Sequence, residues 1–527
     1  MGTYINIGNA GFQRARNSEY VDKSGLIAVV NNTLFTERCF SCVTRCRRFG
    51  KSMAAKMLYA YYDHSCDSRS LFADLQIAND PSFEKHLNKY PAIYLDITSF
   101  VTRYHDEGIV DKIDAALLAD VSKAYPDVLV EEGDDLMDYL LRVSEAKQQQ
   151  FVFIIDEWDA ICREFAPGTN AMDAYVTWLR RMFKSQQAMR VFACAYMTGI
   201  LPIKKYKTES ALNNFLEYSM VTPRKMAQFF GFTKEEVKAL AEKHGSDFDE
   251  LEKWYDGYQI GDESSMFNPN SVIQAVESDW CESYWGKTGA YDAVARYIRM
   301  NFGGLKDDVI QMLGGGRVKV NTTKFQNDMS VIESKDDVLT VLIHLGYLSY
   351  DRRTLECYIP NKEVAGEMVN AIEDNNWTEV VKALDASEQL LQATLDGDEE
   401  AVARGVDAVH NENTSILSYN NENSLACVLS LAYYYAKNDY VVHRELPTGR
   451  GFADLVMIPR KHVSSPAIIL ELKYNKDADT AISQILRKEY PAKVAEYAGD
   501  LLLVGVNYDK ETKQHSCRIV KINKNDE

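Results

Sequence analysis

The chain has 527 residues, of which 46% are hydrophobic and 26% are charged, with only 28 Gly and 12 Pro. This composition excludes collagen-like, low-complexity and mostly disordered chains, and the length allows several domains, each with its own core. The 59 Lys and Arg residues stand against 77 Asp and Glu, which gives a formal net charge of -18. Because such a surface repels nucleic acid, any nucleic-acid site has to be a local basic patch.

The sequence does not indicate membrane insertion or secretion. It contains no apolar run of roughly 18 residues, and its N-terminus lacks the apolar core of a signal peptide. Ten cysteines at irregular positions indicate reduced thiols rather than a disulfide framework. We therefore expect a cytoplasmic protein that makes no membrane contact.

The first part of the chain, residues 1–223, alternates short apolar runs with longer amphipathic patterns. The runs cover residues 37–44, 91–98, 151–157 and 189–199. Nearly continuous apolar strands separated by helices are typical of a parallel sheet that is covered on both faces. We predict an α/β domain here.

Residues 224–410 have a mainly helical pattern, which predicts a helical lid. Within this region, residues 335–360 predict a helix followed by a hairpin, either a winged-helix-like element or a small structural hairpin. From residue 411 to 527, period-2 strands surround a helix and predict a second, compact α/β domain. The predicted fold is thus α/β at both ends of the chain.

A phosphate-binding motif follows the first predicted strand. The segment 45–52, RCRRFGKS, leads directly into a helix. In a P-loop, amide groups at the helix N-terminus surround a phosphate, the lysine reaches the outer phosphates and the serine holds Mg²⁺. Gly50, Lys51 and Ser52 supply these elements, although Arg45 stands where the first glycine of the motif is expected.

Two further strand ends complete a candidate ATP site. The strand 151–157 ends in Asp156, which can meet Mg²⁺ through water, and Glu157, which can orient or deprotonate the attacking water. The strand 189–199 ends near Thr198, a candidate sensor of the γ-phosphate. Together these motifs predict ATP binding and hydrolysis with Mg²⁺.

Arginines near the loop leave alternatives open. Arg45, Arg47 and Arg48 can contact phosphates or a nucleic-acid backbone, or form a solvated basic rim around the ATP site. Arg180 and Arg181 lie on a predicted amphipathic helix. They act either as arginine fingers toward a neighbouring subunit or as ordinary surface cations.

The C-terminal region carries a second candidate site. Glu471 and Lys473 alternate on one strand, so their side chains project from the same face, and Asp454 lies on the preceding strand. Two carboxylates and the Leu472 carbonyl can hold Mg²⁺ or Mn²⁺, while Lys473 orients or activates the water that attacks a phosphodiester. The alternative is a row of charged side chains on the protein surface that has no catalytic role. A local basic groove for nucleic acid is predicted from Arg444, Arg450, Arg460, Lys461, Lys473, Lys476, Arg487 and Lys488.

Several motifs together resemble a known family. The runs YVDKSGLI (20–27), RCRRFGKSM, IIDEWDA, TGI, WYDGY and FNPNSV are similar to those of the bacterial AAA-ATPase-like family, whose members commonly carry a C-terminal domain of the PD-(D/E)XK nuclease superfamily. Arg45 occupies the first-Gly position in that family too. This chain departs from the family pattern at Ser24, Cys46, Trp158 and Asn270, where the family has Thr, Pro, Tyr and Trp.

The resemblance implies roles for individual residues. For ATP and Mg²⁺ it implies a site at Gly50, Lys51, Ser52, Asp156 and Glu157, with Thr198 as a sensor candidate. The adjacent loop residues Arg48, Phe49 and Met53 are further candidates for nucleotide binding. For the nuclease it implies Asp454, Glu471 and Lys473 as the core motif, with Glu445 as an added acid. It also implies Glu422 on a first helix and Gln484 followed by Tyr490. Phe452 replaces the usual Arg two residues before Asp454, so a phosphate contact is lost or passes to Arg450.

The expected function is an ATP-binding and ATP-hydrolysing protein whose Mg²⁺-dependent nuclease domain cleaves DNA or RNA, in defence or mobile-element biology. The alternative is an ATP-driven regulatory switch that acts through protein partners and uses the nuclease fold for binding only. Self-assembly into a homo-oligomer is compatible with either function.

Overall fold

The protein is described here by a computed structural model. The structure describes residues 2–522 apart from residues 105–107, 166–169, 204, 207–208, 211, 286–295, 301, 326–331, 374–377, 413–428, 430–431, 449–450, 461–462, 464 and 488–499. The chain forms two compact units, one of Met1–Ala290 with Lys319–Val364 and one of Tyr291–Val318 with Ala365–Glu527. The domain boundaries expected after residues 223 and 410 stay predictions.

A five-stranded parallel sheet forms the core of the first unit. The strands lie in the order β2-β3-β4-β1-β7, and each of the four predicted apolar runs forms one of them. Every residue of β1, β3 and β4 is buried. The strands are β1 (Phe40–Thr44), β2 (Ala92–Asp96), β3 (Phe151–Asp156), β4 (Phe192–Gly199) and β7 (Leu216–Tyr218).

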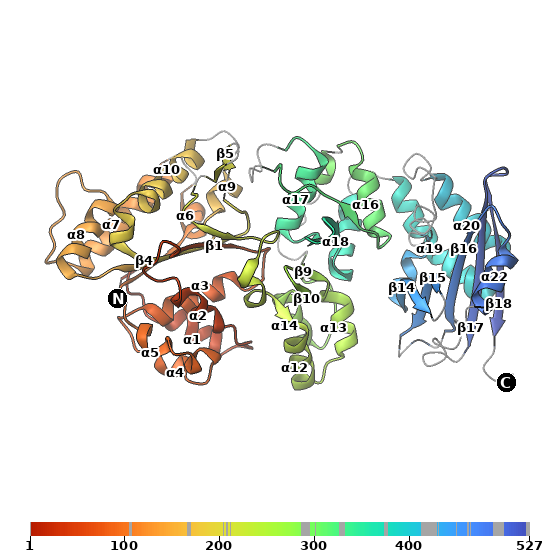
Figure 1. The fold of residues 1–527 in the computed structure, drawn as a ribbon, viewed down its shortest axis with the longest axis horizontal. Coiled ribbons are helices and arrows are strands. Elements are labelled where there is room, and N and C mark those ends of the chain that lie inside the picture. Colours follow the sequence, from red (N-terminus) through yellow and green to blue (C-terminus); the bar gives the residue numbers. More distant parts are fainter. Residues whose placement is uncertain are drawn as a thin grey trace. The chain divides into compact units, whose positions relative to one another are not determined.

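Helices cover both faces of this sheet, as the apolar strands require (Figure 1). The predicted α/β class of the N-terminal region is confirmed. One face carries α1 (Ala10–Arg16), α2 (Gly25–Asn31), α3 (Lys51–Tyr62), α4 (Arg69–Phe72) and α5 (Phe83–His86). The other face carries α6 (Ile97–Arg103), α7 (Ile109–Ala124), α8 (Leu136–Lys147), α9 (Ala160–Glu164) and α10 (Asn170–Lys184).

The middle of the chain is mainly helical, as predicted. Thr233 and Glu236 form a capping box that starts α12. The helix and hairpin predicted at residues 335–360 are α17 (Lys335–Leu345) and the antiparallel pair β12 (Ser349–Asp351) and β13 (Glu356–Tyr358). The other elements of the first unit here are β8 (Phe232–Thr233), α12 (Lys234–His244), α13 (Phe248–Tyr255), β9 (Tyr258–Ile260), β10 (Glu263–Phe267), α14 (Pro269–Ser278) and α18 (Lys362–Glu373), of which α18 extends into the second unit.

A second five-stranded sheet lies in the second unit, in the order β14-β15-β16-β17-β18. Only β16 and β17 are parallel, and α22 (Ala478–Arg487) connects them and packs on both. Period-2 strands around one helix are thus present as predicted. The strands are β14 (Tyr440–Thr448), β15 (Gly451–Pro459), β16 (Ala467–Tyr474), β17 (Leu501–Asp509) and β18 (Gln514–Ile522), and further helices are α16 (Leu305–Leu313), α19 (Thr378–Asp396) and α20 (Glu399–Glu412).

None of the helices that the structure describes combines the length and the apolar character that a membrane crossing requires.

Candidate functional sites

The phosphate-binding loop lies between β1 and α3. Gly50 caps α3 with a φ of 86°, a left-handed conformation that glycine adopts without strain. Lys51 is only 4% exposed, and its Nζ donates to the carbonyl oxygen of Cys46 at 3.0 Å. The lysine is therefore folded back against its own loop, close to where phosphate oxygens bind in a P-loop.

The carboxylates that follow β3 face this loop. Asp156 is buried and accepts a hydrogen bond from the Tyr94 hydroxyl at 2.8 Å, with the side chain of Ser52 close by. Glu157 Oε1 lies 3.8 Å from Lys51 Nζ. Burial raises the pKa of both carboxyl groups, because charge is poorly solvated there. Lys51, Ser52, Asp156 and Glu157 thus converge at one end of the sheet.

Thr198 lies at the end of the neighbouring strand β4. Its side chain is fully buried, and its Oγ1 has no hydrogen-bond partner among the described residues. The next residue has to be glycine, since a Cβ at Gly199 would lie 2.5 Å from Asp159 Oδ1. A buried hydroxyl without a partner suits an anion such as the γ-phosphate, and the carboxylate–hydroxyl pair of Asp156 and Ser52 suits Mg²⁺.

A cavity of about 460 Å³ opens beside the loop. Its lining contains Glu157 and every loop residue from Arg48 to Met53. Segments far apart in sequence add apolar residues, among them Met57, Phe232 and Ile273, and the charged residues Glu19, Lys23 and Glu277. A cavity that combines phosphate-binding groups with apolar residues fits a nucleotide.

The middle region braces the phosphate-binding loop. The Phe49 ring packs edge-on against Tyr258, with centroids 5.0 Å apart, and the Phe49 carbonyl accepts from Gly231 N at 3.3 Å. Gly346 approaches Cys46 so closely that a Cβ there would lie 2.5 Å from Cys46 Cβ. Sequence reasoning missed this brace because its residues are about 180 to 300 positions from the loop.

The structure excludes both sequence interpretations of Arg45, as part of a solvated basic rim and as a contact to phosphate or nucleic acid. Its side chain is 0% exposed and donates to the carbonyl oxygens of Thr44 at 2.8 Å, Tyr218 at 2.7 Å and Met226 at 3.3 Å. Its guanidinium also lies over the Phe230 ring. Burial lowers the pKa of Arg45 to about 10, so it stays charged at neutral pH. Arg45 joins β1 and β7 to the segment near Met226.

We expect Arg45→Ala to destabilise the first unit by about 3 kcal/mol or more, because three buried carbonyl groups lose their donor. Urea denaturation followed by circular dichroism measures the change. Arg48→Ala is the matched control: Arg48 is exposed and has a φ of 66°, which alanine tolerates no worse than arginine. Equal stability of the two variants would contradict a structural role for Arg45.

Arg180 and Arg181 are both exposed on α10. Arg181 pairs with Asp135 and, at 3.4 Å, with Asp138 on the neighbouring α8. This pairing agrees with the interpretation as surface cations, and the arginine-finger interpretation stays a prediction.

The second candidate site lies on β16. Glu471 is 2% exposed, and its Oε1 accepts from Lys473 Nζ at 2.9 Å and from Gln484 Nε2 on α22. The structure therefore brings three of the predicted nuclease residues together. Because Lys473 is also buried, its ammonium group is held beside the carboxylate rather than in solvent.

Strand register places two further predicted acids beside this cluster. Leu455 pairs with Leu470 across the antiparallel strands β15 and β16. The next position along each strand therefore sets Asp454 opposite Glu471. On the other side, Arg444 pairs with Leu455 and Leu446 with Ala453, so Glu445 stands opposite Asp454. The side chains of Glu445 and Asp454 lie outside the described residues. Among those described, no three His, Cys, Asp or Glu side chains gather as a metal site.

The predicted basic groove is only partly described. Lys476 is exposed, and Arg460 is half-buried and donates to the Tyr440 carbonyl at 3.3 Å. The groove stays a prediction. The following residues or their side chains lie outside the described part of the chain: Glu422, Arg444, Arg450, Phe452, Lys461, Arg487, Lys488 and Tyr490.

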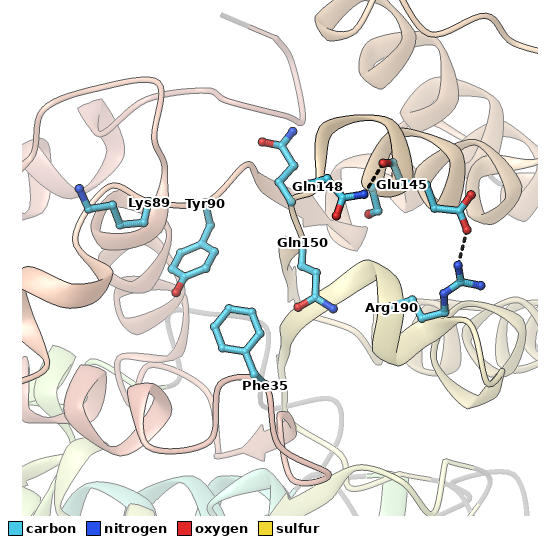
Figure 2. Close-up of a pocket in the computed structure, with 9 residues that line it drawn as sticks. Phe35, Lys89, Tyr90, Glu145, Gln148, Gln150 and Arg190 are labelled. Atoms are coloured by element: carbon cyan, nitrogen blue, oxygen red, sulfur yellow. Dashed lines mark hydrogen bonds and ion pairs between the residues drawn. The ribbon is translucent and has the colours of Figure 1, made fainter.

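Another cavity, of about 520 Å³, lies at the amino ends of the strands of the N-terminal sheet, opposite the phosphate-binding loop (Figure 2). Tyr90 precedes β2, Gln150 precedes β3 and Arg190 precedes β4. The exposed Phe35 ring lies beside Tyr90, and Arg190 pairs with Glu145. The residues that line this cavity belong to none of the predicted motifs, whereas the candidate ATP site lies at the carboxyl ends of the strands.

Two family models match separate parts of the chain. The family described as "Predicted AAA-ATPase" matches residues 6–208, and the PD-(D/E)XK nuclease superfamily matches residues 420–517. An uncharacterized protein in the vnfD 5' region of Azotobacter chroococcum mcd 1 is 24% identical over 299 residues, which are 54% of this chain and 54% of that protein. The chain thus spans about half the length of this relative.

Among solved structures, the Aeropyrum pernix ORC2 protein in its ADPNP–ADP complexes matches 69% of this chain and 98% of its own, with 12% identity and a TM-score of 0.26. The two family matches cover the two candidate sites separately. The chain therefore contains a domain of the Predicted AAA-ATPase family at its N-terminal end and a domain of the PD-(D/E)XK nuclease superfamily at its C-terminal end.

Proposed function

We propose that the protein binds and hydrolyses ATP and cleaves phosphodiester bonds of DNA or RNA with Mg²⁺, as a hydrolase with two active sites. The observation that carries the nuclease assignment is the hydrogen-bonded cluster of Gln484 with the buried Glu471 and Lys473 inside the superfamily domain. Charged side chains without a function stay in solvent, because burying a lysine and a carboxylate together costs desolvation free energy.

In the ATP site, Lys51 leaves the Cys46 carbonyl and neutralises charge on the outer phosphates. Glu157 accepts the proton of the attacking water, and the Thr198 hydroxyl donates to the γ-phosphate. Ser52 and Asp156 would hold Mg²⁺, which when bound neutralises negative charge on phosphate oxygens. The apolar residues that line the 460 Å³ cavity receive the base.

In the nuclease site, Lys473 orients the attacking water toward the phosphorus atom, and Gln484 and Lys473 fix the orientation of the Glu471 carboxylate. Asp454, Glu471 and the Leu472 carbonyl would hold the divalent cation, which is Mg²⁺ or Mn²⁺. The cation when bound polarises the scissile phosphate. Nucleic acid enters through the local basic groove, because the net charge of -18 disfavours contact elsewhere.

The two sites on one chain support a nuclease whose action depends on ATP, for use in defence or mobile-element biology. The test incubates the purified full chain with labelled single-stranded and duplex DNA and RNA, with Mg²⁺ or Mn²⁺, and with or without ATP. We expect at least one substrate to be cut, and ATP to change the rate. Cleavage of none of them would overturn the nuclease assignment and favour an ATP-driven switch that acts through protein partners.

A further inference from the structure

One arginine holds two carboxylates directly after β3. Arg163, on α9, is 11% exposed. Its Nη2 donates to Glu157 Oε2 at 2.6 Å, and its Nε donates to Asp159 Oδ2 at 3.0 Å. Sequence reasoning assigned no role to Arg163 or Asp159, although their i, i+4 spacing on a helix was a visible signal.

Asp159 extends this contact to the turn that follows Thr198. It is fully buried, and its carboxylate accepts from the backbone N–H groups of Ile200 at 3.2 Å and Leu201 at 2.9 Å. The backbone of the same segment adds a contact, because Trp158 N donates to the Thr198 carbonyl at 2.9 Å. A short chain of hydrogen bonds therefore joins the candidate base to the backbone of the turn that follows the candidate sensor.

The Glu157 carboxylate lies between two cations on opposite oxygens. Lys51 Nζ is 3.8 Å from Oε1, whereas Arg163 Nη2 is 2.6 Å from Oε2. Once Lys51 turns to the phosphates of a bound nucleotide, Arg163 is the cation that still holds the carboxylate. Glu157 also has a φ of 51°, so its backbone occupies a conformation that needs support from its surroundings.

We propose that Arg163 is a positioning residue for ATP hydrolysis: it fixes the Glu157 carboxylate and ties its orientation, through Asp159, to the turn after Thr198. This inference rests on the proposed ATPase function. Arg163 acts through the Glu157 carboxylate, to which its guanidinium donates. A small displacement of a reacting group is enough to slow a reaction strongly, so the guanidinium controls the rate of the chemical step rather than nucleotide binding.

A double-mutant cycle on the full chain tests the proposal. It uses Arg163→Ala, Glu157→Gln and the double variant, with single-turnover phosphate release, steady-state kcat and KM, and titration calorimetry with a non-hydrolysable ATP analogue. We expect Arg163→Ala to lower kcat by about 10- to 100-fold while KM and the Kd of the analogue stay within about 2-fold. In the Glu157→Gln background the same change should add almost nothing, because the group that Arg163 positions is already lost.

Two further variants separate positioning from general stability. Arg163→Lys should restore part of kcat, since lysine keeps one charge but cannot reach both carboxylates as a planar guanidinium does. Arg190→Ala removes an exposed arginine that pairs with Glu145 at the opposite edge of the sheet, and should leave kcat unchanged. Melting curves without nucleotide show whether each variant is folded at the assay temperature.

The outcomes are distinguishable. An equal loss of kcat in the wild-type and Glu157→Gln backgrounds, or a change confined to KM and Kd, would overturn the positioning role. If the wild type shows no ATP hydrolysis that depends on Lys51, the ATPase function is overturned, and this inference with it. ATP hydrolysis that is as fast in Arg163→Ala as in the wild type would overturn only the inference.

Discussion

Replacing Lys473 by Ala is expected to lower the rate of phosphodiester cleavage by about 10²- to 10⁴-fold, the range for loss of a group that activates or orients the attacking water. Lys473 Nζ contacts the buried Glu471 carboxylate, so its removal disturbs both the water and the candidate metal ligand. Initial rates on the substrate that the wild type cuts fastest measure the loss.

The matched control is Lys510→Ala, because Lys510 is an exposed lysine just after the neighbouring strand β17 and lies outside the predicted basic groove. Loss of Lys473 leaves a buried carboxylate without its cation, which destabilises proteins by about 3–5 kcal/mol. Glu471→Gln removes that buried charge together with the candidate metal ligand, and its cleavage rate is therefore measured beside that of Lys473→Ala. Circular dichroism shows whether each variant is folded. Cleavage by a folded Lys473→Ala protein at the wild-type rate would contradict the assigned site.

Glu157→Gln is expected to lower kcat for ATP hydrolysis by about 10²- to 10⁴-fold and to leave ATP binding almost unchanged. The amide keeps the size of the side chain but cannot accept the proton of the attacking water. Lys51→Ala should instead weaken binding, because the loop loses the cation that faces the phosphates. Phosphate release and titration with a non-hydrolysable analogue separate the two effects.

Glu132→Gln is the control for this experiment, since Glu132 is an exposed acid in the loop before α8 and does not line the cavity beside the phosphate-binding loop. Its turnover should match the wild type. ATP hydrolysis that survives both Lys51→Ala and Glu157→Gln would remove the P-loop from the mechanism, whatever the nuclease domain does.

The strands and their order in the chain were predictable because each is a short apolar run between amphipathic helices. Asp156, Glu157 and Thr198 were found because they stand at strand ends, and parallel strands bring those ends together. The helix and hairpin at residues 335–360 followed from hydrophobic periodicity and turn residues in the same way.

Other features could not be predicted from local sequence patterns, because they depend on contacts between distant segments. A buried arginine and a solvated one look alike in sequence, so the structural role of Arg45 depended on carbonyl groups contributed by Tyr218 and Met226. The brace of Tyr258 and Gly346 on the loop, and the role of Asp159, likewise depend on segments that meet only in the folded chain.

The brace between Phe49 and Tyr258 links nucleotide occupancy to the stability of the first unit. A nucleotide in the cavity contacts the loop and, through Asn270 and Ile273, the helix α14 of the middle region, so binding adds to the free energy that holds these segments together. At a concentration 100 times its Kd, ATP should stabilise the folded unit by about 2.7 kcal/mol. The same linkage makes the middle region a determinant of affinity: substitutions at Tyr258 should change the Kd for ATP although this ring does not line the cavity.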